Sequence, residues 1–123
     1  MNRIKTILIV DDASLIRSVA SKAAIEAGYD VVLAEDGSEG LIKLKENQID
    51  MVFSDVNMPN MGGLEMVTEI KKDMAYKFLP IVMLTTESKP ELKEKGKALG
   101  VKAWLVKPFN KTKFLIALEK LLG

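Results

Sequence analysis

Residues 6–12 read TILIVDD, a mainly apolar run rich in β-branched side chains that ends at two aspartates. Four similar runs follow along the chain: DVVLA at 30–34, MVFS at 51–54, PIVML at 80–84 and AWLV at 103–106. None of them alternates between apolar and polar residues, as expected for strands of a parallel sheet that is covered on both faces. We therefore predict five parallel strands.

The segments between these runs carry apolar residues at a helical period. The residues are Leu15, Ile16, Val19, Ala20 and Ala23; Leu41, Ile42 and Leu44; Leu64, Val67 and Ile70; Leu92, Gly96 and Leu99; and Phe114, Leu115, Leu118 and Leu122. The fourth set is a narrow stripe, so we expect its helix to be thinly anchored. Turn signals lie at Gly28, Gly37, residues 59–63 and Gly100. Repeated βα units predict an α/β fold: a five-stranded parallel sheet of order 2-1-3-4-5 in a doubly wound, flavodoxin-like (βα)5 sandwich.

The composition fits one globular domain covering residues 1–123, with 48% hydrophobic and 28% charged residues. The first apolar run stops at Asp11, too early for a signal peptide, and no later segment is long enough to span a bilayer, so we expect a cytoplasmic protein without membrane contact. Cysteine and histidine are absent, which excludes disulfides, thiolate or imidazole metal sites and a phosphohistidine on this chain. Its chemistry must use carboxylates, hydroxyls and lysines.

The net charge of +1 hides an uneven distribution. Residues 1–86 hold nine Lys/Arg and thirteen Asp/Glu, whereas residues 87–123 hold nine and four. This asymmetry suggests a binding face on the last third of the chain, with an ordinary solvated surface as the alternative. Nucleic-acid binding is not expected, because the positive charge is neither large nor interleaved with exposed aromatic residues.

Polar residues follow the predicted strands at the edge where ligands bind in doubly wound sheets. They are Asp11 and Asp12 after the first strand, Asp55 after the third, Thr85 and Thr86 after the fourth, and Lys107 after the fifth. Three carboxylates in one small volume repel one another, so a cation is required, and Mg²⁺ suits carboxylate and phosphate oxygens. Such a metal and a lysine would stabilise phosphoryl transfer to an aspartate.

Each of these residues also has an ordinary structural interpretation. Asp11 and Asp12 could cap the first helix, Asp55 could open a turn, Thr85 and Thr86 could end a strand, and Lys107 could be a surface lysine. The hypothesis of a phosphoacceptor site rests on their convergence at one edge.

The order of the motifs resembles the receiver domain of bacterial two-component response regulators. The resemblance covers essentially the whole chain and rests on ILIVDD at 7–12, SDVNMPNMGGLEM at 54–66, MLTTES at 83–88 and VKPF at 106–109. It implies that Asp55 is the phosphoacceptor, supplied by the phosphohistidine of a histidine kinase or by a small acyl phosphate. The protein would then be a signalling phosphoacceptor and not an enzyme, promoting only its own phosphorylation and dephosphorylation.

The resemblance also assigns roles to individual residues. Mg²⁺ would be bound by Asp12, Asp55 and the Asn57 main-chain carbonyl, with Asp11 assisting directly or through water. Lys107 and Thr85 would contact the phosphoryl oxygens, Thr85 and Trp104 would form the switch, and Asn57 and Glu87 would tune dephosphorylation. The bond between Lys107 and Pro108 would be cis. Gly62 stands where the family often has Asp, which weakens the cap of the third helix.

Within the family, the chain is most similar to the single-domain, CheY-like chemotaxis group, because Asn57 and Glu87 follow Asp55 and Thr85 by two residues and the chain ends with its fifth helix. This implies a monomer that presents a face made by the fourth helix, fifth strand and fifth helix. The face carries Lys89, Lys93, Lys97, Trp104 and Lys111, and an acidic or amphipathic peptide is its expected partner, such as a flagellar motor switch component. The alternatives are a phosphorelay carrier, a non-phosphorylated scaffold and, from a different class, a haloacid-dehalogenase-like Mg²⁺-dependent phosphatase.

Overall fold

The five apolar runs form one parallel sheet in the computed structural model, which describes residues 3–86 and 89–123. The strands are β1 (Thr6–Val10), β2 (Asp30–Ala34), β3 (Met51–Asp55), β4 (Ile81–Thr85) and β5 (Ala103–Val106). Their order across the sheet is β2-β1-β3-β4-β5, and every neighbouring pair is parallel. The predicted fold class and strand order are confirmed.

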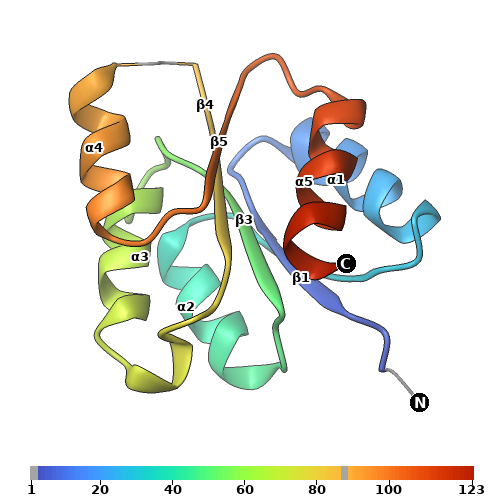
Figure 1. Ribbon diagram of the computed structural model, residues 1–123, viewed down its shortest axis with the longest axis horizontal. Coiled ribbons are helices and arrows are strands. Elements are labelled where there is room, and N and C mark those ends of the chain that lie inside the picture. Colours follow the sequence, from blue (N-terminus) through green and yellow to red (C-terminus); the bar gives the residue numbers. More distant parts are fainter. Residues whose placement is uncertain (1–2, 87–88) are drawn as a thin grey trace.

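Helices cover both faces of this sheet (Figure 1). They are α1 (Ser14–Glu26), α2 (Gly37–Glu46), α3 (Gly63–Lys71), α4 (Pro90–Ala98) and α5 (Lys111–Leu122), with a short 3-10 helix, η1 (Met74–Tyr76), that the periodicity did not predict. The helices α1 and α5 pack on one face, and α2, α3 and α4 on the other. The sheet is therefore the middle of three layers.

The core lies on both sides of the sheet because successive strand residues point to opposite faces. Along β1, Ile7 and Ile9 pack with α1 and α5, whereas Leu8 and Val10 pack with α2 and α3. All residues of β3 and β4 are buried. The edge strands differ, since β2 exposes Leu33 and β5 exposes Val106. The expectation of two covered faces holds for the central strands and is wrong for these edges, where a neighbouring strand is missing on one side.

Some of the predicted apolar stripes are wider than the faces that the helices bury. In α1, Ala20 and Ala23 are buried, whereas Leu15 is 70% exposed and Val19 is 40% exposed. Small alanine side chains allow the helix to approach the sheet closely, and the larger residues next to the stripe remain in solvent. The predicted thin anchoring of α4 is confirmed, because Gly96 is its one buried residue among those described.

Candidate functional site

The carboxylates of Asp11, Asp12 and Asp55 meet at the carboxyl edge of the sheet. Val10 of β1 pairs with Ser54 of β3, so the residues that follow them, Asp11 and Asp55, lie side by side. One carboxylate oxygen from each of the three aspartates lies within 4.8 Å of the others. Asp11 is 1% exposed and Asp55 is 4% exposed, whereas Asp12 faces solvent. Two of the three carboxylates are therefore buried, and the third, that of Asp12, is exposed to solvent.

Asp11 has the chemistry of a metal ligand. Its Oδ1 accepts a hydrogen bond from the Ala13 backbone N–H at 2.9 Å, and its buried Oδ2 has no hydrogen-bond partner among the described residues. Burial raises the pKa of Asp11 to about 6, and the charges of Asp55 and Asp12 add to that rise. A buried, unpaired carboxylate oxygen beside two further carboxylates suits a hard divalent cation such as Mg²⁺.

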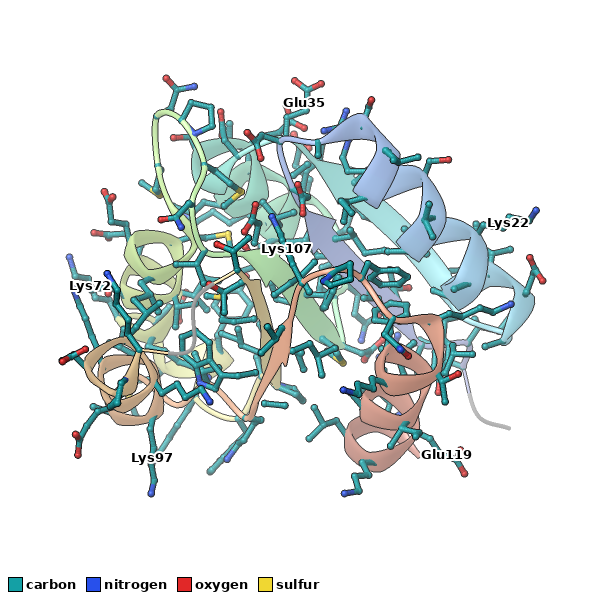
Figure 2. The ribbon with its side chains drawn as sticks, turned by 90° about the horizontal axis from the view of Figure 1, so that it is seen from above. Lys22, Glu35, Lys72, Lys97, Lys107 and Glu119 are labelled. Atoms are coloured by element: carbon teal, nitrogen blue, oxygen red, sulfur yellow. The ribbon has the colours of Figure 1, made fainter. Side chains whose placement is uncertain are left out.

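Asp55 is held in place by one hydrogen bond to each carboxylate oxygen. Its Oδ1 accepts from the Val56 backbone N–H at 2.8 Å, and its Oδ2 accepts from Lys107 Nζ at 3.1 Å. Lys107 follows β5, and its backbone N–H donates to Thr85 O at 2.8 Å, which fixes the lysine beside the end of β4. Viewed from above, Lys107 lies near the middle of this edge, whereas Lys97 and Lys72 point outward at the periphery (Figure 2).

The other candidate residues of the site lie at the ends of the strands or in the loops that follow them. Thr85 is buried at the end of β4, and Thr86, the next residue, is exposed. Asn57 is exposed in the loop after β3. The bond between Lys107 and Pro108 is cis. Glu87 lies outside the described residues.

Trp104 stands away from the carboxylates. It pairs with Met83 of β4 and is half-buried in the core cluster shared by α3 and α4. Trp104 and Asp55 lie on β5 and β3, which are separated in the sheet by β4.

The capping interpretation does not explain both aspartates after β1. The residue that caps α1 is Ala13, and no side chain caps this helix. Asp11, two residues before Ala13, accepts a hydrogen bond from the Ala13 N–H, and Asp12 is not the cap. The residue before α3 is Gly62, likewise without a side-chain cap, as its sequence position predicted.

Three further residues shape the site and were missed from the sequence. Arg17 Nη1 donates to the Asp11 carbonyl oxygen at 2.6 Å, and nothing in the sequence pattern singles this arginine out. Gly63 packs so closely that a Cβ atom there would collide with the Asp55 carbonyl oxygen; the paired glycines at 62–63 were a signal for it. Asn60, at φ 67°, donates to Asp36 Oδ2 at 2.9 Å and ties the loop after β3 to the start of α2.

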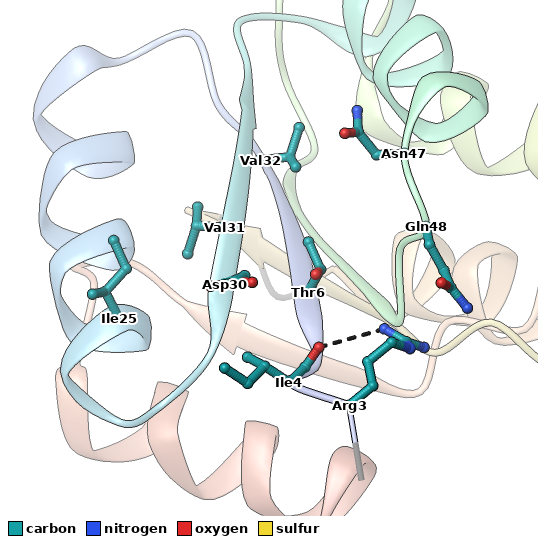
Figure 3. Close-up of a pocket in the computed structure, with 9 residues that line it drawn as sticks. All are labelled: Arg3, Ile4, Thr6, Ile25, Asp30, Val31, Val32, Asn47 and Gln48. Atoms are coloured by element: carbon teal, nitrogen blue, oxygen red, sulfur yellow. Dashed lines mark hydrogen bonds between the residues drawn. The ribbon is translucent and has the colours of Figure 1, made fainter. Parts of the chain in front are cut away.

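A hollow at the opposite edge of the sheet lacks the cluster of carboxylates and lysine found at the candidate site (Figure 3). It measures about 720 Å³ and is lined by the start of β1, by β2 and by the segment after α2. Its arginine, Arg3, is already paired with Asp50 at 2.5 Å. The carboxylates and the lysine converge at the other edge.

Comparison with known proteins settles the family. The profile described as response regulator receiver domain matches residues 7–119. The chain belongs to this family. The receiver domain is CheY-like: chemotaxis protein CheY1 of Helicobacter pylori is 39% identical over 120 residues, covering 95% of this chain and 96% of the relative.

Solved structures agree with the family assignment of this receiver domain. Vibrio cholerae chemotaxis protein CheY4 superposes with a TM-score of 0.93 at 46% identity, covering 98% of this chain and 100% of that one. Response regulator TrrA from Thermotoga maritima, solved in complex with Mg²⁺-BeF, gives a TM-score of 0.85 at 34% identity, covering 97% and 100%. These matches do not support the haloacid-dehalogenase alternative. No helix in the described ranges of this receiver domain is long and apolar enough to cross a membrane.

Proposed function

We propose that this chain acts as a single receiver domain that accepts a phosphoryl group on Asp55. The donor is the phosphohistidine of a histidine kinase, or a small acyl phosphate. The observation that supports this most directly is the 3.1 Å contact between Lys107 Nζ and Asp55 Oδ2 beside the carboxylates of Asp11 and Asp12. A lysine ammonium and a carboxylate lie together there in one partly buried site, which supports the proposed phosphoryl transfer to Asp55.

The chemistry divides among the residues of the site. Asp11, Asp12, Asp55 and the Asn57 carbonyl would hold Mg²⁺, which when bound supplies positive charge that offsets the carboxylates and the phosphoryl oxygens. A carboxylate oxygen of Asp55 forms a bond to phosphorus as the bond from phosphorus to the donor's histidine nitrogen or acyl oxygen breaks.

The other residues hold the reactants or set the lifetime of the product. The Val56 N–H and the Lys107 ammonium orient the Asp55 carboxylate. Lys107 and the Thr85 hydroxyl then contact the transferred group. Asn57 and Glu87 tune its hydrolysis, so the protein turns over only its own phosphoryl group.

Mass spectrometry tests the phosphoacceptor assignment. Incubation with a small acyl phosphate and Mg²⁺ should add one phosphoryl group, and Asp55→Asn or removal of Mg²⁺ with a chelator should abolish the addition. Asp30→Asn, which alters an exposed aspartate on β2, is the matched control and should label normally. Labelling that persists in Asp55→Asn would contradict the assignment.

The face formed by α4, β5 and α5 is the proposed output surface. Lys89, Lys93, Lys97 and Lys111 are exposed there. A groove of about 320 Å³ between β5 and α5 has an apolar floor that includes Leu105 and Ile116, and lysines 102, 113 and 120 among its lining residues. An acidic, amphipathic helix fits this combination, and a flagellar motor switch component is the partner class that the chemotaxis relatives favour.

Binding assays separate the output roles. The fluorescence of Trp104, the one tryptophan of the chain, should change when Mg²⁺ and beryllofluoride are added together, and should not change in Asp55→Asn. A pull-down with and without this mimic distinguishes a motor switch, which retains its target only with the mimic, from a relay carrier, which retains phosphotransfer proteins instead. That the protein is a monomer, and that it lies in the cytoplasm, are predictions that these assays do not test.

A further inference from the structure

The position of α4 is tied to Trp104 through a single glycine. Of the described residues of α4, Gly96 alone is fully buried. A Cβ atom built on Gly96 would overlap Cζ2 of Trp104, and would lie 3.1 Å from both Cε2 and Cη2 of the same ring. The indole therefore occupies the space that a side chain at position 96 would fill.

The neighbours of Gly96 leave little freedom for a compensating shift. Its carbonyl oxygen accepts from the Leu99 N–H at 3.1 Å and from the Val101 N–H at 2.9 Å, which closes the end of the helix. The next residue, Lys102, donates its backbone N–H to Ile81 O of β4 at 2.8 Å. The backbone of Gly96 is thus linked to the sheet by the short segment that leads into the strand carrying Trp104.

Other contacts of α4 are weaker. Leu92 and Leu99 are partly buried in the cluster that also contains Trp104, and the remaining described residues of the helix are exposed. Because the ring lies against the one buried position among the described residues of α4, the ring cannot move toward the helix without displacing it, and its departure would remove a packing contact at that position.

The geometry points to Gly96 as a positioning residue. The Trp104 indole packs against it, so that a displacement of the ring displaces α4. The regulatory half of this inference rests on the proposed function and on the switch role that the family resemblance implies for Trp104. It identifies the contact by which the phosphoacceptor would alter the output face.

A double-mutant cycle tests the steric half without any phosphorylation. Alanine normally stabilises a helix relative to glycine, so Gly96→Ala should raise the melting temperature unless the ring blocks it. We expect Gly96→Ala to lower the melting temperature in the Trp104 protein and to raise it in a Trp104→Ala or, where that variant folds poorly, a Trp104→Leu background. The same sign in both backgrounds would overturn the inference.

Spectroscopy and a matched control complete this test. Gly96→Ala should shift Trp104 emission to longer wavelength and increase its quenching by iodide, because the ring is pushed toward solvent. Lys95→Ala, at the neighbouring exposed position, should leave Trp104 emission unchanged. Its effect on the melting temperature should have the same sign with and without Trp104. Unchanged emission in Gly96→Ala would also overturn the inference.

The regulatory half is tested with an environment-sensitive thiol probe on Lys95→Cys, a unique site because the chain has no cysteine. Mg²⁺ with beryllofluoride should change both Trp104 fluorescence and the probe signal, and Trp104→Ala should abolish the probe response. A response of Trp104 without a response of the probe overturns the inference and leaves the proposed function intact. Silence of both reporters, with beryllofluoride binding verified by fluorine NMR, overturns the inference together with the proposed switch.

Discussion

Asp11 is a buried carboxyl group with one oxygen unpaired among the described residues, and burial raises its pKa to about 6. Folding therefore favours its protonated form. The stability that comes from this preference is fully present below the ordinary pKa near 3.8 and is lost as the pH rises to 6 and beyond. At neutral pH without a cation, the buried carboxylate of Asp11 is ionised and destabilises the fold, but it is then in the form that binds a metal ion.

Asp11→Asn should reveal that penalty. In a chelating buffer at pH 7, we expect the variant to be more stable than the parent by about 1 to 2 kcal/mol, since roughly 1.4 kcal/mol accompanies each pKa unit and the buried amide loses part of the gain. The difference should vanish near pH 4. Urea unfolding at both pH values measures it, with Asp30→Asn as the exposed control; a parent protein more stable than Asp11→Asn at pH 7 would contradict the interpretation.

Gly63 is required by a close approach of backbone to backbone. Its N–H donates to Val56 O at 2.8 Å, and a Cβ atom would collide with the Asp55 carbonyl oxygen. Gly63→Ala should therefore destabilise the protein by about 1 to 3 kcal/mol, as overpacking does in other cores, although alanine is the better helix former.

The same collision should affect the proposed chemistry, because it would shift the backbone of Asp55, the proposed phosphoacceptor. We expect Gly63→Ala to weaken Mg²⁺ binding, measured by titration calorimetry, while Glu69→Ala, exposed on the same helix, leaves it unchanged. Full Mg²⁺ affinity in Gly63→Ala would show that the backbone relaxes without moving Asp55.

At the scale of elements, local pattern predicted the central strands and failed where tertiary contacts decide. The runs at β1, β3 and β4 are mainly apolar and do not alternate, because both of their faces are covered, and sequence alone shows this. The predicted strand order already made β2 and β5 the edges, but the local pattern did not show that Leu33 and Val106 would be exposed there. In α1 the stripe included Leu15, which is 70% exposed, because a helical period does not say how wide a face is buried.

The residues of the site likewise fall into those that the sequence predicted and those that it did not. Residues at strand ends, such as Asp55 and Lys107, could be placed together once the strand order was inferred, because parallel strands end at one edge. Contacts made by side chains from elsewhere could not be predicted. The bond from Arg17 to the Asp11 carbonyl and the contact of Gly96 with Trp104 depend on how helices pack, which no local signal encodes.

Unequal anchoring of α3 and α4 should appear in amide hydrogen exchange. The helix α3 buries five residues, whereas α4 buries Gly96 alone among its described residues. Because local opening depends on how much packing is lost, the amides of α4 should exchange at least about tenfold faster than those of α3, since each 1.4 kcal/mol of opening energy corresponds to a factor of ten. Both helices lie on the same face of the sheet, so α3 serves as the internal control. Equal protection would contradict thin anchoring.

At the scale of the whole molecule, the site joins segments that are far apart in the sequence. Asp11 and Asp12 follow β1, Asp55 is the last residue of β3, and Lys107 follows β5. A ligand at this edge therefore binds the folded chain and finds no equivalent in the unfolded one. The strand β5 belongs to the proposed output surface of α4, β5 and α5, and Lys107, which follows this strand, contacts Asp55.

Mg²⁺ should accordingly stabilise the whole fold. A ligand that binds only the folded state adds about 2.7 kcal/mol when its free concentration is one hundred times its dissociation constant. We expect the midpoint of urea unfolding to rise with Mg²⁺ and to rise further when beryllofluoride is added. Asp12→Asn and Asp55→Asn should both reduce the first rise, because each removes a proposed metal ligand. Asp55→Asn should also abolish the second rise, because it removes the proposed attachment point. Asp73→Asn, an exposed aspartate outside the site, should keep both; equal rises in all four proteins would mean that Mg²⁺ acts elsewhere on the surface.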